Sequence, residues 1–555
     1  MKTSLQKFIA TLFILVIFQS NFGIAQTNWQ WAKSAGATGS EATTGTVVDA
    51  GGNVYAVGWY TSATITFGGT TLTNPGSFTG DMFLTKYDAA GNVLWAKTFG
   101  GVDGEIGNAI AIDVSGNVYV TGWFTSTALV MDTYTISNSG TASSDMFVAK
   151  VDPNGNTMWL KGANGSGGDR GLGIAVDASG NVFVGGAFNS GSVNFGTGGL
   201  TNAGTNTSDI FLVKYNSSGV AQWAQSAGGS ANDLANGVAV DSIGNAYITG
   251  YFSSVNVNFG TGIINNNTTN TQDIFVTKYN GSGTAVWAQR AGGSMDDYAN
   301  AIAVKGNRLY ITGGFNSASI AIGTTTLNNS SAGTSDFVLA KYDLNGNALW
   351  ATEAGSTDSE AGNGITTDAA GNVFVCGFYI SNTITFGTNT LTNAVGGYRD
   401  LFVAAFTSNG FAAWAATATA GSYDETANTL ATTASGSDVY VGGSFNSGVV
   451  SFGATNVFKG CGDDVFVAKL TGSAVGIKEN TKKEQLLVYP NPTSGKFTVE
   501  GDGQIIFYNV LGEEVRNEKV NKHQTFDFSS QAKGVYVYKI ISTDKKVYSG
   551  RVVVE

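Results

Sequence analysis

Hydrophobic and polar residues alternate in short runs along most of the chain, with the period of two that a half-buried β-strand shows. One stretch contains four such runs in succession: 108–113, 117–124, 145–152 and 157–161. The sequences DVSGN and DPNGN join the first pair and the last pair. Both are signals of tight hairpins, because Asp caps the turn and Gly adopts its left-handed position. We therefore expect a repeat unit of four antiparallel strands, called A, B, C and D in chain order.

This repeat unit recurs along the chain. An aromatic residue of strand B, an Asp at the start of strand C and a Trp in strand D each return about every 64 residues, in seven copies. The strand B aromatics are Tyr55, Tyr119, Phe183, Tyr247, Tyr310, Phe374 and Tyr440. The strand D tryptophans are Trp31, Trp95, Trp159, Trp223, Trp287, Trp350 and Trp414. Because a single four-stranded sheet cannot bury both faces, the copies must stack, and such units predict a β-propeller.

The two ends of the repeat region contain complementary fragments of a unit. The last strand C, from Asp464, has no strand D after it, whereas Trp31 lies in a strand D with no strands A to C before it. In a ring the N-terminal strand completes the last sheet, but an open array would leave two unpaired edges. We therefore predict an all-β chain in which residues 27–471 form a seven-bladed β-propeller closed by an N-terminal strand. Trp29 has no counterpart in the other copies, so the repeat assigns it no role.

Two phrases of the repeat resemble a known family. IAIDVSGNVYVTG and DMFLTKYDAAGNVLWAK are similar to the bacterial β-propeller repeat called SBBP, over roughly residues 28–470. This resemblance implies the architecture and leaves ligand and activity open, because function depends on sites and not on folds.

The N-terminus has the features of an exported protein. Lys2 and Lys7 precede an apolar run, Phe8 to Phe18, which is too short to span a bilayer, and Gly23 to Ala25 offer small residues for cleavage. We expect residues 1–25 to be a signal peptide. No other apolar run approaches a transmembrane length, so we expect no transmembrane segment.

After the repeats, residues 472–484 form a polar linker, and residues 485–555 contain strand-like runs that predict a small β-sandwich. This last part resembles the type A C-terminal sorting domain of the Bacteroidetes type IX secretion system. The matching residues are Tyr489, Pro490, Asn491, Pro492, Gly534 and Gly550. The resemblance implies that the secretion machinery recognises residues 485–555. It also implies that the protein is secreted or held at the outer cell surface, where lipopolysaccharide or another surface glycan is a candidate partner.

Composition narrows the possible chemistry. The formal charge is −11 and only 12% of residues are charged, which argues against nucleic acid as a partner and against an anionic membrane surface. The one histidine, His523, lies outside the repeats, so histidine-based catalytic triads and histidine-ligated metals are excluded from the propeller. Cys376 and Cys461 favour two free thiols over one disulfide. We expect no catalytic residues.

One acidic position recurs between strand D and the next strand A. Its members are Glu41, Glu105, Asp169, Asp233, Asp297, Glu360 and Asp424. Since strand A lines the central channel of a propeller, these carboxylates are candidates for a ring at the channel mouth that binds a polar ligand or a cation, with Ca²⁺ as the candidate and no other cofactor expected. The alternative, which we favour, is that each carboxylate accepts backbone N–H bonds and fixes the crossover between blades.

The B–C connections carry about 20 residues each, whereas the A–B and C–D connections are minimal turns. The face with the long connections, called here the decorated face, is therefore the expected binding face. We predict a non-catalytic binding or adhesion scaffold. The alternatives are a glycan hydrolase or lyase that uses carboxylates on this face, and a structural surface-coat protein. A sector that breaks the sevenfold pattern would favour the enzyme, and the sequence shows none.

Overall fold

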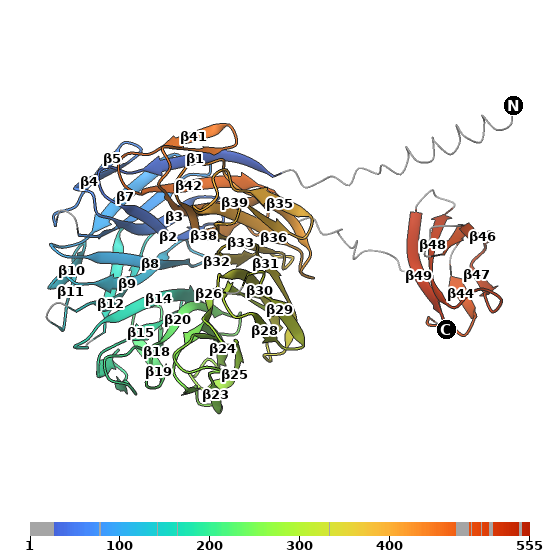
Figure 1. Ribbon diagram of the computed structural model, residues 1–555, viewed down its shortest axis with the longest axis horizontal. Coiled ribbons are helices and arrows are strands. Elements are labelled where there is room, and N and C mark those ends of the chain that lie inside the picture. Colours follow the sequence, from blue (N-terminus) through green and yellow to red (C-terminus); the bar gives the residue numbers. More distant parts are fainter. Residues whose placement is uncertain are drawn as a thin grey trace. The chain divides into compact units, whose positions relative to one another are not determined.

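A computed structural model describes residues 27–76, 79–140, 143–163, 165–331, 333–472, 488–489, 491–500, 502–509, 514–542 and 547–555. The chain divides into a repeat domain, Met1–Gly476, and a C-terminal domain, Ile477–Glu555. The signal peptide expected at residues 1–25 and nearly all of the expected linker lie outside the described residues. Every regular element within the described residues is a β-strand (Figure 1).

The repeat domain contains, within its described residues, seven four-stranded antiparallel sheets, numbered here 1 to 7. In the order A, B, C, D they are β2 (Glu41–Val48), β3 (Val54–Tyr60), β6 (Asp81–Tyr87), β7 (Val93–Phe99); β8 (Glu105–Ile112), β9 (Val118–Phe124), β12 (Asp145–Val151), β13 (Thr157–Gly162); β14 (Asp169–Val176), β15 (Val182–Phe188), β18 (Asp209–Tyr215), β19 (Ala221–Ala227); β20 (Asp233–Val240), β21 (Ala246–Phe252), β24 (Asp273–Tyr279), β25 (Ala285–Ala291); β26 (Asp297–Lys305), β27 (Arg308–Phe315), β30 (Asp336–Asp343), β31 (Ala348–Ala354); β32 (Glu360–Thr367), β33 (Val373–Tyr379), β36 (Asp400–Phe406), β37 (Ala412–Ala416); and β38 (Glu425–Thr432), β39 (Asp438–Phe445), β42 (Asp464–Thr471), β1 (Asn28–Ala35).

Each B–C connection carries a two-stranded hairpin. The hairpins are β4 (Thr64–Phe67) with β5 (Thr70–Thr73), β10 (Ala128–Met131) with β11 (Tyr134–Ser137), β16 (Ser192–Asn194) with β17 (Gly199–Thr201), β22 (Asn256–Asn258) with β23 (Ile263–Asn265), β28 (Ser319–Ile322) with β29 (Thr325–Asn328), β34 (Thr383–Phe386) with β35 (Asn389–Thr392), and β40 (Val449–Phe452) with β41 (Thr455–Phe458).

The tight turns follow from their residues. In sheet 2, Oδ1 of Asp152 accepts the backbone N–H groups of Asn154 and Asn156, both at 2.8 Å, and Gly155 takes a positive φ of 86°. The Asp side chain thus satisfies the N–H groups of the loop, and the glycine supplies the left-handed residue that a bulged hairpin needs. This turn chemistry keeps the end of the sheet opposite the inserts short.

The hydrophobic core lies between sheets. Strand A of each sheet contacts strand A of the next, from β2 through β8, β14, β20, β26 and β32 to β38, and β38 contacts β2 again (Figure 1). At the junction of sheets 2 and 3, Tyr119 and Trp159 pack in one buried cluster with Val184 and Phe211. A corresponding cluster lies at each of the other junctions, including that between sheets 7 and 1. Each sheet is therefore stabilised by its two neighbours.

The N-terminal strand β1 belongs to the sheet farthest from it in sequence. It pairs antiparallel with β42, from Asn28 opposite Thr471 to Ala35 opposite Val465, and the two strands run side by side in Figure 1. Trp29 donates its indole N–H to the Thr417 carbonyl at 3.1 Å and meets the Phe452 ring edge-on at 4.8 Å. The tryptophan without a counterpart therefore joins β1 to sheets 6 and 7.

The C-terminal domain contains two sheets that share one core. The first has the order β43 (Val488–Tyr489), β44 (Lys496–Glu500), β47 (His523–Asp527), and the second has the order β46 (Glu514–Val520), β45 (Gly503–Tyr508), β48 (Gly534–Ser542), β49 (Val547–Val554). Phe497 and Phe526 of the first sheet lie in one buried cluster with Ile505, Phe507 and Tyr538 of the second. In the repeat domain, Cys376 is buried, Cys461 is exposed, and both are free thiols.

Candidate functional site

Six of the seven predicted acidic positions are structurally equivalent. Glu41, Glu105, Asp169, Asp233, Asp297 and Glu360 each begin a strand A, and each is 0% exposed. In sheet 7 the equivalent residue is the buried Glu425, and the predicted Asp424 is exposed one residue earlier. The fixed spacing selected Asp424 because the segment between Trp414 and β38 is one residue longer than its counterparts. Glu425 therefore replaces Asp424 in this set.

These carboxylates point into the protein and not into the channel mouth. Asp169 accepts the hydroxyl of Ser190 at 2.7 Å and its backbone N–H at 3.2 Å. Asp233 accepts the hydroxyl of Ser254 at 2.7 Å and the backbone N–H of Gly229 at 3.0 Å. Each acid thus ties the start of its strand A to the segment after strand B and to the D–A connection. This geometry has the form of the crossover-fixing alternative.

A second buried acid faces each of these carboxylates from the preceding sheet. It is the Asp that begins strand C, and the resulting carboxyl pairs are Asp81 with Glu105, Asp145 with Asp169, Asp209 with Asp233, Asp273 with Asp297, Asp336 with Glu360, Asp400 with Glu425, and Asp464 with Glu41. All fourteen side chains belong to buried residues. The position that begins strand C was noted in the sequence as a repeat landmark, but nothing there places it against the next strand A.

Burial and mutual repulsion shift the titration of these pairs. Burial raises the pKa of Asp81 to about 8, and the negative charge of Glu105 raises it further. The pKa of Glu425 is also raised to about 8 by burial, and that of Glu41 to about 7. Both oxygens of Asp81 and Oε1 of Glu105 have no hydrogen-bond partner among the described residues. At neutral pH such a pair is therefore expected to hold a proton.

The carboxyl pairs offer no open site for a substrate, because their members are buried at the junctions between sheets. Within the described residues, no group of three or more His, Cys, Asp or Glu side chains is placed to hold a metal ion. What the pairs can do chemically is store protons and couple the stability of neighbouring sheets to pH.

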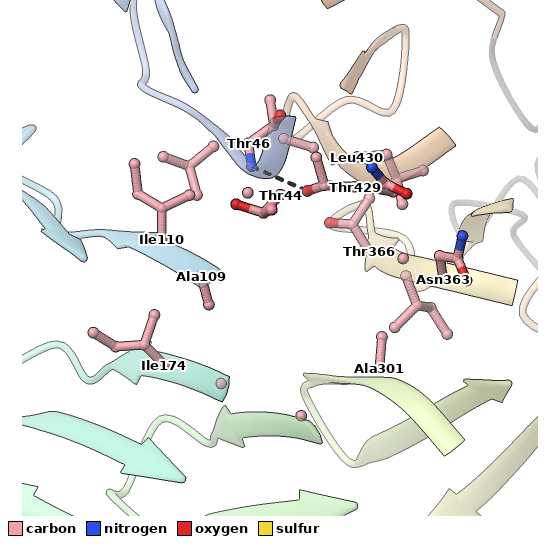
Figure 2. A pocket seen from close by; sticks show the side chains of 18 of the residues that line it. Thr44, Thr46, Ala109, Ile110, Ile174, Ala301, Asn363, Thr366, Thr429 and Leu430 are labelled. Atoms are coloured by element: carbon pink, nitrogen blue, oxygen red, sulfur yellow. Dashed lines mark hydrogen bonds between the residues drawn. The ribbon is translucent and has the colours of Figure 1, made fainter. Parts of the chain in front are cut away.

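The central channel is a separate feature. A cavity of about 460 Å³ is lined by the A strands of all seven sheets, and Figure 2 shows their side chains converging on it. In each strand A one residue forms a β-bulge, and in six sheets it bonds a backbone carbonyl of the next strand A. The bonds run from Thr44 to Gly107, Asn108 to Gly171, Asn236 to Ala299, Asn300 to Gly362, Asn363 to Ala427, and Asn428 to Thr43. The seventh bulge residue is Leu172, which has no polar side chain.

On the decorated face, the variable aromatics before the end of strand B are only half-buried. Trp59, Trp123, Tyr251 and Phe378 all fall in this class. The Arg170 guanidinium lies 5.2 Å from the Trp123 ring centroid, and that of Arg399 lies 4.4 Å from the Phe378 ring centroid. These rings are covered in part by their neighbours and do not form free platforms by themselves.

One sector of the decorated face departs from the sevenfold pattern. Tyr398 and Tyr423, from the loops before β36 and β38, are 40% and 53% exposed, and their ring centroids lie 5.7 Å apart at an interplanar angle of 57°. Arg399 and Lys459 lie beside them. These four residues are called here the tyrosine sector. Sequence reasoning missed it, although aligning the repeat copies position by position would have shown aromatic residues where the other copies have small or polar ones.

The sorting-motif residues mostly lie around the last strand. Asn491 donates its amide to the Arg551 carbonyl at 2.8 Å and accepts the Val553 N–H at 2.9 Å, so its side chain replaces a paired strand beside β49. Gly550 leaves room for Tyr538, whose hydroxyl would lie 2.3 Å from an added Cβ, and Gly534 has a positive φ of 151°. Tyr489 donates to Glu500 at 2.6 Å. Pro492 follows in the same loop, and Pro490 lies outside the described residues.

Comparison with known proteins identifies the C-terminal domain. Residues 487–555 match the family model described as "Secretion system C-terminal sorting domain". The match implies handling by type IX secretion machinery and export from the cell. Within the described residues, no helix is long and apolar enough to cross a membrane.

The repeat domain has distant relatives. The chain is 24% identical over 364 residues to the uncharacterized WD repeat-containing protein L264 of Acanthamoeba polyphaga mimivirus, covering 54% of this chain and 26% of that protein. It is 25% identical over 280 residues to the regulatory protein FlaEY of Caulobacter vibrioides, covering 48% and 29%. The chain thus spans less than a third of the length of these relatives. Among solved structures, U3-55K has a TM-score of 0.42 at 8% identity, over 80% of this chain and 99% of that one. The WD40 propeller domain of Doa1 has a TM-score of 0.39 at 10% identity, over 80% and 97%.

Proposed function

We propose that this protein is a binding scaffold that type IX secretion delivers to the outer cell surface or the medium. Its body is a closed seven-bladed propeller, and its decorated face holds the ligand without chemical change. The pairing of β1 with β42 and the continuous series of contacts among the A strands support the closed ring. The sorting-domain match of residues 487–555 supports the route of export.

The observation that carries the binding role is the asymmetry of the sheet ends. At one end of each sheet lie the long B–C inserts with their hairpins, and the D–A loops lie beside them, as when the Thr125 N–H donates to the Gly104 carbonyl at 2.7 Å. At the other end, Asp-capped turns keep the surface short. Long, varied loops on a rigid scaffold are the usual location of binding residues.

The glycan-active enzyme remains the second candidate, because the carboxyl pairs have the raised pKa values that a general acid requires. Their complete burial, however, supports a structural role for these acids. A hydrolase or lyase would have to use exposed carboxylates such as Asp424. The third candidate, a surface-coat protein, requires no specific ligand.

A glycan array, probed with the full chain with and without Ca²⁺, separates these candidates. The scaffold should bind a restricted set of glycans and leave them intact. Absence of binding to every glycan would contradict the proposal and favour the coat protein. Shortened glycans would favour the enzyme.

A further inference from the structure

The tyrosine sector is not required by the fold. At the position of Tyr398, the backbone carbonyl accepts the amide of Asn393 at 2.8 Å. The same bond occurs in five other sheets, where the acceptor is Thr79, Ser143, Thr207, Thr271 or Thr334. The backbone supplies this bond in every case, so a large aromatic side chain adds nothing to it.

Tyr423 departs from its counterparts in the same way. Its backbone N–H donates to the Ser447 hydroxyl at 3.2 Å. The same donor position is held in other sheets by Gly39, Asp103, Gly167, Ala231, Met295 and Asp358. Two exposed tyrosine rings therefore meet at one junction between sheets where the shared architecture needs neither.

Two cations accompany the rings. The Lys459 ammonium lies 5.6 Å from the Tyr423 ring centroid and donates to Oδ1 of Asn446 at 2.5 Å. The Arg399 guanidinium lies over the Phe378 ring. Within the described part of the chain, neither Arg399 nor Lys459 makes an ion pair.

The carboxylates nearby are already engaged. Oδ1 of Asp424 accepts the backbone N–H of Arg399 at 2.9 Å, which also ties the two tyrosine loops together. Oδ1 of Asp463 accepts the amide of Asn446. The sector thus combines two exposed aromatic rings with two cations that lack an anionic partner. This combination complements a ligand with both an apolar face and a negative charge.

We propose that the tyrosine sector binds an acidic polysaccharide built of uronic acids. The weakly polar face of a pyranose ring stacks on Tyr398 or Tyr423, and the sugar carboxylate pairs with Arg399 or Lys459. This assignment rests on the proposed function, since it names the ligand class of the decorated face.

The test measures the affinity of the full chain for polygalacturonate and for the same polymer with its carboxyl groups reduced to alcohols. The variants Tyr398→Thr, Tyr423→Ala, Arg399→Ser and Lys459→Asn each install a residue that other repeat copies carry, so the fold should be kept. Tyr134→Thr is the matched control, because Tyr134 is a 38% exposed tyrosine of the sheet 2 insert and Thr is its counterpart in other inserts.

We expect the native chain to bind polygalacturonate at least about tenfold more tightly than the reduced polymer, a difference of about 1.4 kcal/mol. Each tyrosine variant should weaken binding to both polymers. The Arg399 and Lys459 variants should remove the preference for the acidic polymer and the dependence on salt, and the Tyr134 variant should change neither.

Two results would overturn the inference. If the native chain binds polygalacturonate and all four variants bind it equally well, the tyrosine sector is not the site, although the proposed scaffold function stands. If the native chain binds neither polymer but binds other glycans on an array, the ligand class is wrong. Failure to bind any glycan at all would contradict the proposed function itself.

Discussion

The buried carboxyl pairs make a quantitative prediction about Asp81. This side chain is 0% exposed, neither of its oxygens accepts a hydrogen bond from the described residues, and its pKa is raised from 3.8 to about 8 by burial and by Glu105. A group with a raised pKa in the folded state contributes full stability below its unfolded pKa. That contribution is lost as the pH rises toward the folded pKa. The native protein should therefore lose stability between about pH 4 and pH 8.

Replacing Asp81 with Asn removes the ionisable group. At pH 7, keeping the acid protonated costs up to about 4 kcal/mol, from 1.36 kcal/mol per pH unit above 3.8, and structural relaxation reduces this to about 2 to 4 kcal/mol. The new amide can also donate to Oε1 of Glu105. For a domain of about 450 residues unfolding as one unit, 1 kcal/mol corresponds to about 1 °C in Tm. Asp81→Asn should therefore raise Tm by about 2 to 4 °C at pH 7 and by under about 1 °C at pH 4.

Scanning calorimetry of the full chain across pH 4 to 8 measures this effect. Asp88→Asn is the matched control. Asp88 is an exposed turn residue whose pKa is lowered by hydrogen bonds, first from the Asn92 amide. A lowered pKa contributes stability above the unfolded pKa, so this control should lose stability at pH 7 and lose less at pH 4. An Asp81→Asn variant that is destabilised equally at both pH values would refute the protonated pair.

Three further outcomes follow from the same structure. Trp31→Ala should lower Tm by several degrees, because it empties a buried site in the strand that completes sheet 7 and such truncations cost about 3 to 5 kcal/mol; an unchanged Tm would contradict ring closure. Leu172→Asn should raise Tm slightly, by about 0.5 to 1.5 kcal/mol of stability, because it supplies the missing bulge bond toward the next strand A; a lower Tm would show that the leucine packs better than the amide bonds. Deletion of residues 485–555 should leave the protein inside the cell envelope, and cell fractionation with immunoblotting measures this; normal release would contradict sorting by this domain. Asn491→Ala should weaken the attachment of β49, seen as faster hydrogen exchange at Val553 than in the native chain.

Much of the fold was accessible from the sequence because the repeat reports it seven times. The turn glycines and Asp caps, the strand alternation and the unmatched strand of Trp31 each have a local physical cause, and the model shows the corresponding strands and the pairing of β1 with β42. Local patterns do not encode what lies across a junction. The pairing of Asp81 with Glu105 depends on two sheets meeting, so the sequence predicted one acidic set and missed the other.

The limits of counting were also physical. A fixed period selected Asp424, but the D–A segment before β38 contains one extra residue, and the buried position belongs to Glu425. The tyrosine sector was missed for a different reason. The repeat emphasises what the copies share, whereas Tyr398 and Tyr423 matter because the other copies lack them. Their proximity depends on the junction of sheets 6 and 7, which only the three-dimensional arrangement reveals.

The most direct test of the central claim incubates the full chain with a panel of purified polysaccharides and measures two quantities together. These are the fraction of polymer bound at equilibrium and the number of new chain ends formed. A binding scaffold predicts saturable binding of at least one polymer with no new chain ends over many hours. New chain ends that accumulate in proportion to protein concentration, or no binding to any polymer, would contradict the account.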